Sequence, residues 1–509
     1  MLAVQLRPQD APLPAVVAPP NAAADRLAQW RAAFPAVDAL ICAGVLPSAA
    51  LRRLGLTFWS AGEAQAAAEA LTESVALEPG DAAAWLDLGF ARRAAAQTPA
   101  ALAAFERAAD LAPDMARIWL AVGLTAKDLG EIRRAEAALE KALSLDPALD
   151  DATYVLGLLC FEARRYAEAA RQWRALVERG YTAPGLWLGL GQCQFFLGEF
   201  AAAAHSLAEY LKTAPGDAAI TRRLTLVRFL EGAIHGGPEG ALAAYQLASG
   251  DPAASITLIA RNAVPLLAGY GYVATALSVA RAFLASDADD PVHRHQIAAL
   301  TAEPVSRAPA EYVAAYFDRF AESFDTQMFE VLQYCGPRKL SRLVAATGSP
   351  SARTLDLGCG TGAAGALLRP GASRLVGVDL SANMLDKARA KGVYDDLDQA
   401  DMIEYLAARR GAFDLIFAAD SLIYLGDLSA LLEAAAGALA PGGSLALTLE
   451  ATTRSPYELT TSGRFAHSPR ATIAAAAPWF SLRASKRAFL RLEAHRRIHG
   501  ALIVLERRG

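Results

Sequence analysis

Cysteine, basic runs and long apolar runs are scarce or absent in this sequence, and each absence argues against a class of protein. The 509 residues include five cysteines, scattered and without a CxxC pair, which argues against a disulfide-rich secreted protein and predicts a reducing, cytoplasmic compartment. No apolar run is long enough to span a membrane. The formal charge is -4 and no Lys/Arg run with interleaved aromatic residues occurs, so we expect no nucleic-acid partner. The one basic stretch, from Arg483 to Arg497, is predicted to be a solvated strand and turn.

Histidine is also scarce, and the N-terminal segment lacks the features of a signal peptide. Among the seven histidines, His293 and His295 form a lone HxH pair that we expect at the surface, and no metal site is predicted. Residues 1–24 are rich in Ala and Pro and lack a basic start and an apolar core, which predicts a flexible tail. With 54% hydrophobic residues, the chain is long enough to fill at least two cores.

A period of 34 residues governs the N-terminal part of the chain. Glycines and alanines recur at this spacing, and small residues are needed where two helices cross closely. A 34-residue period with W…LG…A…F…P spacing resembles the tetratricopeptide repeat (TPR), a helix-turn-helix unit that stacks into a superhelix. We predict five such repeats over residues 48–217, a capping helix over 25–47 and degenerate helical repeats over 218–307. The recurring residues are Gly55, Gly89, Gly123, Gly157 and Gly191, and Ala67, Ala101, Ala135, Ala169 and Ala203.

Three positions of each repeat are expected to point into the concave face of the superhelix. The side chains at these positions are mostly apolar, which favours an apolar peptide or helix as the partner, or the protein's own helices. They are Arg52, Leu86, Leu120, Tyr154 and Leu188 at the fifth position, Leu56, Phe90, Leu124, Leu158 and Gln192 at the ninth, and Trp59, Arg93, Lys127, Phe161 and Phe195 at the twelfth.

A glycine-rich segment, LDLGCGTG at residues 355–362, ends an apolar run and leads into a helical pattern. Alternating glycines allow the backbone to approach a ligand closely, because side chains there would block it. With Ala363 and Asp379 the segment also satisfies a dinucleotide-binding pattern. Asp356 argues against that alternative, because its carboxylate would face a pyrophosphate, and it suits a positively charged ligand instead. The three glycines are Gly358, Gly360 and Gly362.

This segment and the sequence after it resemble the motifs of class I methyltransferases that use S-adenosylmethionine (SAM), whose ammonium and sulfonium groups are positively charged. The resemblance implies that Asp379 binds the ribose hydroxyls and that Asp401 and Met402 bracket the adenine. It also implies that the strand over 413–418 carries the residues facing the methyl group. Tyr316 either closes over the cofactor or packs in the core. The predicted cofactor-binding residues are Asp356, Gly358, Gly360, Gly362, Asp379, Leu380, Asp401, Met402, Ala419 and Tyr316.

From residue 308 to residue 509, strand patterns alternate with helical ones, which predicts a doubly wound sheet with its ligand at the carboxyl ends of the central strands. The last two strands, joined by the turn EAHRRIHG, predict an antiparallel hairpin at one edge, as in the seven-stranded class I methyltransferases. The predicted fold class is thus α plus α/β, with a TPR superhelix before a Rossmann-like domain. Strands are expected at 353–357, 374–379, 394–399, 413–418, 443–449, 480–489 and 500–507, and helices at 363–369, 382–391, 402–409, 427–439 and 469–476.

Four further segments narrow the resemblance. They are similar to a bacterial family of predicted methyltransferases that contain TPR repeats, and the similarity covers the repeats and essentially the whole catalytic domain. It implies architecture and cofactor but no acceptor. The segments are YFDRFAESFD at 316–325, AADSLIYLGDL at 418–428, YELTTSGRFAHS at 457–468 and LRLEAHRRIHGALIVLER at 490–507.

The acceptor site has weaker signals. Methyl transfer needs mainly proximity and alignment, and sometimes a base that deprotonates the acceptor. The loop after residues 413–418 is expected to face the methyl group, and it lacks the N/D-PP-Y/F string of methylases that act on planar amide or exocyclic amino nitrogens. Asp420 is either an acceptor contact or a strand-end cap, and Tyr424 either shapes the substrate channel or packs. Ser421 is a further candidate in this loop.

Two residues of the SGRFAH string are also candidates. His467 is either a general base or a structural hydrogen-bonding residue. Arg464 either holds a carboxylate of the acceptor or cofactor, or forms a salt bridge to Glu450 or Glu458. The predicted catalytic residues are Asp420, Tyr424 and His467.

These patterns favour a SAM-dependent methyltransferase that acts on a protein or peptide recruited by the concave TPR face. One alternative is a small-molecule methyltransferase whose repeats serve assembly, for example as a homodimer. Another is a scaffold whose methyltransferase domain no longer turns over, and the intact Asp356, Asp379 and glycine loop argue against it.

Overall fold

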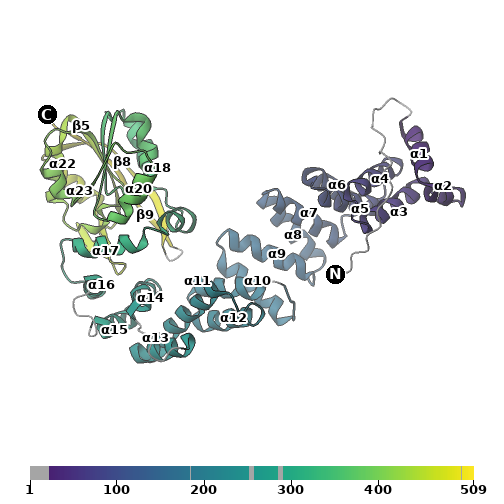
Figure 1. Cartoon of the computed structure of the whole chain (residues 1–509), viewed down its shortest axis with the longest axis horizontal. Helices are drawn as coiled ribbons and strands as arrows, with labels where there is room; N and C mark the ends of the chain where they lie inside the picture. The colour runs from purple at the N-terminus through teal and green to yellow at the C-terminus, as the bar shows by residue number, and fades with distance from the viewer. Residues whose placement is uncertain (1–21, 184, 251–256, 285–290, 494–495) are drawn as a thin grey trace. The chain divides into compact units, whose positions relative to one another are not determined.

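The computed structural model of the chain describes residues 22–183, 185–250, 257–284, 291–493 and 496–509 (Figure 1). The chain forms two compact units, residues 1–193 and 194–509. Most of the tail predicted over residues 1–24 lies outside the described residues, and the first helix begins at Ala22. In the part of the chain that the structure describes, no helix has the length and apolar content needed to cross a membrane.

Two short helices, α1 (Ala22–Ala33) and α2 (Pro35–Cys42), precede the repeats, where one capping helix was expected over residues 25–47. Phe34 between them is extended, with φ -126° and ψ 91°, and Pro35 then begins α2. A residue that precedes proline is pushed out of the helical region by the proline ring. The expected single helix is therefore divided at this proline.

Successive helices then pack in pairs whose two members cross closely. A Cβ atom at Gly89 would lie 2.4 Å from the ring of Phe105, and one at Gly157 would lie 2.3 Å from the indole nitrogen of Trp173. Only glycine fits at such a crossing, which is the packing expected from the 34-residue period. The helices are α3 (Pro47–Ser60), α4 (Ala64–Leu77), α5 (Ala82–Ala94), α6 (Thr98–Leu111), α7 (Ala116–Asp128), α8 (Ile132–Leu145), α9 (Asp150–Glu162), α10 (Tyr166–Glu178) and α11 (Leu186–Leu197), the last of which contains the boundary between the two units.

The second unit begins with the last part of the fifth repeat, which includes helix α12, and continues with helices that lack the TPR spacing. Gly237 has φ 59° and ψ -153°, which is not helical, so the long helix α13 bends sharply there and Pro238 follows. The bend lies within the string HGGPEG, at residues 235–240. The backbone folds back on itself, because a Cβ atom at Gly232 would lie 2.5 Å from the carbonyl oxygen of Gly240. The helices of this region are α12 (Phe200–Thr213), α13 (Ala218–Ser249), α14 (Thr257–Gly269), α15 (Val273–Leu284) and α16 (Pro291–Thr301).

Helix α16 packs against the C-terminal domain through His295. Its Nε2 atom lies 2.8 Å from the carbonyl oxygen of Gly463, and its ring centroid is 4.4 Å from that of Tyr312. The residue is 3% exposed, so the expectation that His295 lies at the surface was wrong. Burial lowers the pKa of His295, which favours the neutral ring with its proton on Nε2, facing the carbonyl.

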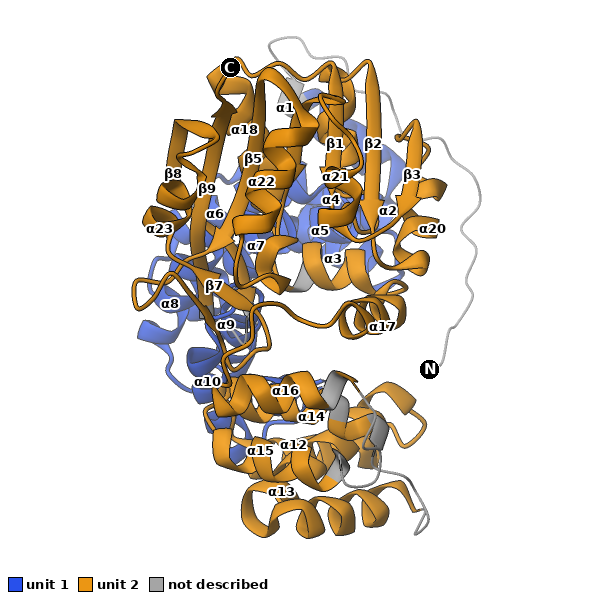
Figure 2. Ribbon diagram, turned by 90° about the vertical axis from the view of Figure 1, so that its left-hand side faces the viewer, with its two compact units in different colours: residues 1–193 blue, residues 194–509 orange. Residues whose placement is uncertain are grey.

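A seven-stranded sheet forms the centre of the C-terminal domain, in the order β3-β2-β1-β4-β5-β9-β8. Strands β3 to β5 in this order are parallel, whereas β9 pairs antiparallel with both β5 and β8. Figure 2 shows β3, β2 and β1 at one side of the sheet and β5, β9 and β8 at the other. The predicted Rossmann-like sheet with an antiparallel hairpin at one edge is therefore confirmed. The strands are β1 (Arg353–Leu357), β2 (Arg374–Asp379), β3 (Asp396–Gln399), β4 (Phe413–Ala418), β5 (Leu439–Glu450), β8 (Phe480–Glu493) and β9 (Arg496–Arg507).

Helices cover both faces of this sheet. One buried cluster joins α21, α22 and α23 to one face, where Leu406 and Leu432 pack with Ile416. A second joins α18 and α19 to strands through Leu340 and Phe417. Apolar burial on both faces is why the central strands are continuous apolar runs. The helices are α18 (Gly336–Thr347), α19 (Gly365–Leu368), α20 (Ala382–Ala390), α21 (Met402–Ala407), α22 (Ser429–Ala438) and α23 (Pro469–Ala476).

Three elements differ from the expectation. Helix α18 was not predicted, nor was the small antiparallel sheet of β6 (Tyr457–Leu459) and β7 (Phe465–His467). Strands β8 and β9 extend into the segment that was assigned to the turn, so the hairpin is longer than expected. Residues 494 and 495, at its tip, lie outside the described residues.

Candidate active site

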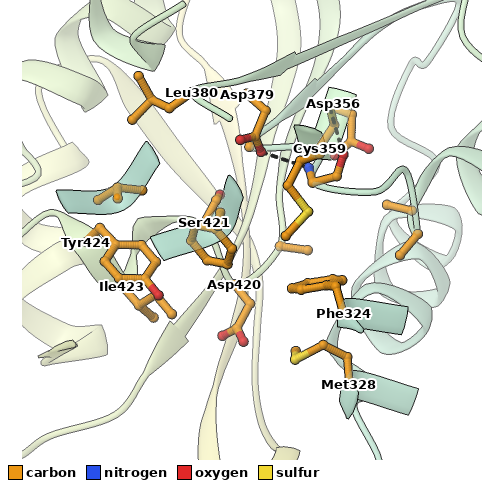
Figure 3. Close-up of a pocket in the computed structure, with 18 of the residues that line it drawn as sticks. Phe324, Met328, Asp356, Cys359, Asp379, Leu380, Asp420, Ser421, Ile423 and Tyr424 are labelled. Atoms are coloured by element: carbon orange, nitrogen blue, oxygen red, sulfur yellow. Dashed lines mark hydrogen bonds between the residues drawn. The ribbon is translucent and has the colours of Figure 1, made fainter. Parts of the chain in front are cut away.

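A cavity of about 1170 Å³, counted with the part open to solvent, lies at the carboxyl ends of β1, β2 and β4 (Figure 3). Strands β1 and β4 are neighbours although β2 and β3 lie between them in the sequence. This is the switch point of the sheet, where doubly wound folds bind ligands. The predicted site residues that line the cavity are Tyr316, Asp356, Gly358, Gly360, Asp379, Leu380, Met402, Ala419, Asp420 and Tyr424. Ser421 and Arg464 also line it.

The glycine loop passes directly under the loop that follows β4. Gly358 has φ 74°, and a Cβ atom there would lie 2.4 Å from the Cβ atom of Ser421. The amides of Gly358 and Cys359 both donate to the carbonyl oxygen of Val378, at 2.8 and 3.0 Å, which fixes the turn. Gly360 has φ 54°, and nothing lies within 4 Å of its Cβ position. The loop therefore presents open backbone to the cavity at Gly360.

Two buried carboxylates flank this loop. Asp379 ends β2, and its two oxygens accept from the amides of Gly360 at 2.8 Å and Ser381 at 2.9 Å. Burial raises the pKa of Asp379, and these amide hydrogen bonds act against that rise. Asp356 in β1 is 2% exposed and accepts a 2.6 Å hydrogen bond from the hydroxyl of Tyr394. Burial raises the pKa of Asp356 to about 7, and the neighbouring Asp379 adds to the rise.

Two residues predicted to bind the cofactor lie outside the residues lining the cavity. At Gly362, with φ 80°, a Cβ atom would lie 2.9 Å from the ring of Tyr394, so this glycine permits close packing. Asp401 caps helix α21, accepting from the amides of Ile403 and Glu404, and its other oxygen pairs with Arg307 at 2.5 Å. The carboxylate of Asp401 is thus already used by the protein.

At the other end of the cavity a buried ion pair holds Asp420. Arg491 Nη1 lies 3.0 and 2.9 Å from the two carboxylate oxygens of Asp420, and its Nη2 lies 2.7 Å from Glu450. The side chains of Arg491 and Asp420 are 1% and 9% exposed. Asp420 also has a left-handed backbone, with φ 59°, and its amide donates to Thr448 Oγ1 at 2.7 Å. Strained residues of this kind are concentrated at functional sites.

Arg491 was not among the predicted site residues, because the stretch around it was expected to be solvated. Strand β8 changes register against β9 between Phe489 and Arg491. Such a β-bulge adds a residue and redirects the side chains beside it. Leu490 and Arg491 are consequently both buried, although they are adjacent in a strand. No signal in the alternating pattern of this strand marks the bulge.

Aromatic side chains from helix α17 (Ala310–Phe320) and the turns after it form a wall of the cavity. Tyr424 packs on this wall, with its ring 5.6 Å from that of Phe317, and Phe317 in turn contacts Tyr316 at 5.3 Å. Figure 3 shows Phe324 and Met328 on one side of Asp420 and Tyr424 on the other. Tyr334 also lines the cavity and donates from its hydroxyl to the carbonyl oxygen of Ala419 at 3.2 Å.

Polar contacts hold this wall against the glycine loop and helix α20. Ser381 Oγ donates to Asp318 at 2.6 Å, and Thr361 Oγ1 donates to Asp325 at 2.5 Å. Lys391 adds an ion pair to Asp325 at 2.8 Å. Side chains of the aromatic wall, the glycine loop and the two ends of α20 therefore hold these segments together.

His467 lies outside the residues that line the cavity. It is 2% exposed, and its Nε2 atom lies 2.8 Å and 3.1 Å from the carbonyl oxygens of Leu425 and Gly426. Because carbonyl oxygens only accept hydrogen bonds, Nε2 carries the proton and donates it to the backbone. Burial lowers the pKa of His467. This geometry favours the structural alternative over a general base.

Arg464 lies in the cavity lining beside Tyr424. Of the two carboxylates expected as its partners, Glu450 contacts Arg491 at 2.7 Å and Glu458 accepts from Thr452 at 2.7 Å. Among the described residues, no group of three or more His, Cys, Asp or Glu side chains is placed to hold a metal ion.

Both the repeat region and the C-terminal domain match models of known protein families. Residues 355–445 match the family model "Methyltransferase domain". Residues 52–116, 120–173 and 161–218 match the model "Tetratricopeptide repeat". The first match covers the glycine loop, Asp379 and the loop after β4, and the second covers the 34-residue repeats.

Relatives with curated descriptions are similar to this chain only in part. Trans-aconitate 2-methyltransferase of Paracidovorax citrulli is 35% identical over 134 residues, which is 26% of this chain and 48% of the relative. Human methyltransferase-like protein 27 is 38% identical over 112 residues, 21% of this chain and 45% of the relative. Ubiquinone biosynthesis O-methyltransferase of Xanthomonas campestris is 28% identical over 136 residues, 26% and 57% of the two chains. The chain thus spans about half the length of these relatives.

Two solved structures, those of NodS and MamA, each resemble a part of the chain. The N-methyltransferase NodS from Bradyrhizobium japonicum, in complex with S-adenosylhomocysteine, is 20% identical with a TM-score of 0.31, covering 38% of this chain and 98% of NodS. MamA is 17% identical with a TM-score of 0.31, covering 34% of this chain and 94% of MamA. Such scores support no statement on function. From the family models and the sheet, the chain joins tetratricopeptide repeats to a class I methyltransferase domain, whose cofactor is S-adenosylmethionine.

Proposed function

We propose that the protein methylates a peptide or protein acceptor that its repeats recruit, with SAM as the methyl donor. The observation that carries the proposal is the combination of a cavity at the switch point of a methyltransferase sheet with a row of half-buried apolar side chains on the repeats. When bound, SAM supplies an activated methyl group on a sulfonium. The protein then has to align the acceptor and exclude water.

The residues around the glycine loop fit SAM. Gly360 leaves open space at its Cβ position, so a ligand can approach the backbone there. Asp379 lies at the end of β2, where ribose hydroxyls would donate hydrogen bonds to its carboxylate. Asp356 is a buried carboxylate beside the loop. Among the described residues its hydrogen-bond and charge partners include no cation, and the positive groups of SAM would supply one. Met402 and Leu380 offer apolar contacts in the same cavity.

Ionisation of Asp356 leads to a pH-dependent affinity for SAM. A cation favours the ionised carboxylate, so SAM binds that form and lowers its pKa. Since the pKa of Asp356 in the free protein is about 7, the carboxyl is protonated below that pH and must release its proton on binding. We expect the Kd for SAM to be constant above pH 7.5 and to rise by up to about tenfold per pH unit below pH 6.5.

Titration calorimetry between pH 5.5 and pH 8 measures this dependence. The variant Asp356→Asn, which cannot ionise, is the matched control, and we expect weaker binding with a flat profile. A profile of equal slope in the wild type and this variant would assign the dependence to another group, such as Asp379.

The repeats supply the recruiting surface of the proposal. In residues 48–193, side chains at the fifth and ninth positions of the repeats, such as Leu120 and Phe90, are neither buried nor fully exposed, except that Leu56 is exposed. The arginines at such positions are already paired, since Arg52 contacts Asp87 at 2.6 Å and Arg93 contacts Asp128 at 2.7 Å. A partner would therefore meet apolar surface with compensated charges, which suits an amphipathic helix or apolar peptide better than a free carboxylate.

The substitution Leu120→Lys in the full chain tests this recruitment. We expect SAM affinity to be unchanged and kcat/KM for a macromolecular acceptor to fall by about 10-fold or more, because a charge replaces a side chain in an apolar contact. The assay incubates each protein with methyl-labelled SAM and a lysate of the source organism lacking this gene. Ile132→Lys, which changes an exposed apolar residue outside these positions, is the control and should label like the wild type. Equal labelling by both variants would contradict recruitment through this face.

A small-molecule acceptor is the second candidate function. The aromatic wall lines the cavity, and two of the relatives are a trans-aconitate 2-methyltransferase and a ubiquinone biosynthesis O-methyltransferase. The repeats would then serve assembly, for example as a homodimer. Label found only in the small-molecule fraction of the lysate assay would favour this candidate. A catalytically silent scaffold is the third, and failure of the purified protein to bind SAM would favour it.

The cellular location belongs to the same proposal. All five cysteines have free thiols, including the buried Cys160, Cys193 and Cys359. Free thiols are typical of reducing compartments, which supports a cytoplasmic location.

A further inference from the structure

Tyr394 lies behind the glycine loop, in the segment between α20 and β3. Its hydroxyl donates a 2.6 Å hydrogen bond to Oδ2 of Asp356, and its ring packs against the buried cluster that includes Leu340 and Phe417. Asp356 lines the cavity, whereas Tyr394 is not among the lining residues. The tyrosine therefore contacts this carboxylate from outside the cavity.

Three glycines leave room for the ring of Tyr394. At Gly362 a Cβ atom would lie 2.9 Å from the Cε2 atom of the ring. At Gly365 it would lie 2.7 Å from Cζ, and at Gly377 it would lie 3.1 Å from Cδ1. These distances are shorter than van der Waals contact, so a side chain at any of the three positions would displace the ring or the loop. The third glycine of the motif, Gly362, thus supports the loop through Tyr394.

The hydrogen bond from Tyr394 occupies one carboxylate oxygen of Asp356. Among the described residues, the other oxygen, Oδ1, has no hydrogen-bond partner. A carboxylate only accepts, so the hydroxyl is the donor when Asp356 is ionised. Burial raises the pKa of Tyr394, and the hydroxyl therefore keeps its proton at neutral pH. The tyrosine holds the carboxylate in one orientation and leaves Oδ1 available to a ligand.

From this arrangement we propose that Tyr394 is a positioning residue for SAM, which acts by orienting the carboxylate of Asp356 and by stabilising its ionised form. The inference rests on the contact between Asp356 and SAM proposed above. A hydrogen bond donated to a carboxylate favours the ionised form over the neutral acid. Without the hydroxyl of Tyr394, the positive groups of SAM would more often meet a protonated carboxyl.

The other titratable groups around Asp356 do not favour its ionised form. Asp379 raises the pKa of Asp356, because two neighbouring carboxylates repel each other. Burial, together with the charge of Asp356, raises the pKa of the Cys359 thiol and that of the Tyr334 hydroxyl, so both groups stay neutral near pH 7. The residues opposite Asp356 in β1's two neighbours, β2 and β4, are uncharged. Among the described residues, this leaves Tyr394 as the group that lowers the pKa of Asp356.

The variant Tyr394→Phe in the full chain tests the inference, because it keeps the ring and removes the hydroxyl. Titration calorimetry with SAM from pH 5.5 to pH 8.5 gives the Kd of the variant and of the wild type. The pKa of Asp356 is about 7 in the free wild type, and we expect it to rise by about one unit in the variant. Ionisation of SAM itself affects both proteins equally. The ratio of the two Kd values should therefore be about tenfold at pH 6, about fivefold at pH 7 and less than about twofold at pH 8.5.

Proton release on binding is a second readout of the same titration. Calorimetry in buffers of different ionisation enthalpy measures the number of protons released for each SAM bound. At pH 8 more of the free variant carries a proton on Asp356, which SAM binding expels. We expect the variant to release about 0.4 more protons per SAM than the wild type at this pH.

The matched control is Tyr405→Phe. The hydroxyl of Tyr405 also donates to a carboxylate, that of Asp398 at 2.7 Å, but this tyrosine is not among the residues that line the cavity. It should bind SAM with the affinity and the pH profile of the wild type. A Kd ratio for Tyr394→Phe that is the same at every pH, whether one or larger, would mean that the hydroxyl does not act on the ionisation of Asp356 and would overturn the inference.

The variant Asp356→Asn separates the inference from the contact on which it rests. Adding Tyr394→Phe to this variant should change SAM affinity by less than about twofold, because the hydroxyl acts through the carboxylate. An equal loss from Tyr394→Phe in both backgrounds overturns the inference and leaves the contact between Asp356 and SAM standing. If Asp356→Asn keeps the pH profile of the wild type, the contact itself is contradicted, and the inference with it.

Discussion

Replacing Gly358 with alanine is expected to abolish measurable SAM binding and to destabilise the methyltransferase domain. The new Cβ atom would lie 2.4 Å from the Cβ atom of Ser421, a distance at which one of the two loops has to move. Ser421 is itself fixed, because its hydroxyl donates to the carbonyl oxygen of Leu357 at 2.8 Å. A shift therefore displaces the end of β1 and the loop after β4 together. Overpacking of this kind costs about 1–3 kcal/mol, beyond about 1–2 kcal/mol for a left-handed alanine.

The variant Gly392→Ala separates these two costs. Gly392 has φ 64°, close to the 74° of Gly358, but nothing lies within 4 Å of its Cβ position. It should therefore show the backbone strain alone and bind SAM like the wild type. Titration calorimetry with SAM and urea unfolding of both variants give the comparison. Similar losses of SAM affinity in the two variants would mean that the contact with Ser421 has no role in holding the loop.

The glycine loop and the repeats were predictable because their function depends on the backbone. Gly358 and Gly89 are needed where a second segment approaches within contact distance, and no other residue satisfies that requirement. Glycine therefore occurs at fixed spacings that can be recognised in the sequence. The strands β1, β2 and β4 were predictable for a related reason, since burial on both faces demands continuous apolar runs.

Side chains whose role is set by tertiary contacts were harder to predict. His295 and His467 are both buried against carbonyl oxygens of distant segments, 168 and 42 residues away along the chain. The residues next to each histidine in the sequence do not indicate these distant partners. Asp401 was expected to contact the cofactor, but the same carboxylate is a helix cap, and Asp is favoured at both kinds of position.

Helix α18 is a different case, because its signals are present in the sequence. Pro337 stands in its first turn and Gly348, with φ 64°, ends it, which is the usual asymmetry of helix termini. Leu340 and Val344 are spaced four residues apart and are the residues that it buries. The position of Arg491 beside Asp420, in contrast, depends on the bulge at Leu490, and the alternating pattern of β8 predicts the opposite orientation for this side chain.

Replacing Arg491 with methionine is expected to destabilise the methyltransferase domain strongly. It leaves Asp420 and Glu450 buried without their shared cation, and breaking a buried pair costs about 3–5 kcal/mol because the remaining charge stays desolvated. Since the chain forms two units, hydrogen exchange of the β5 and β9 amides reports the free energy of unfolding of the domain that contains the pair.

Two comparisons decide whether burial of the charges is the cause. Arg374→Met removes an arginine whose pair with Asp396 is solvent-exposed, and its effect on the same amides should be small because water screens that pair. The triple variant Arg491→Met, Asp420→Asn and Glu450→Gln removes all three charges and should recover much of the lost protection while remaining inactive. If the single and triple variants are equally unstable, then lost packing of the Arg491 side chain, rather than uncompensated carboxylates, destabilises the domain. Recovery in the triple variant would instead mean that the two carboxylates, buried without the guanidinium of Arg491, destabilise the domain in the single variant.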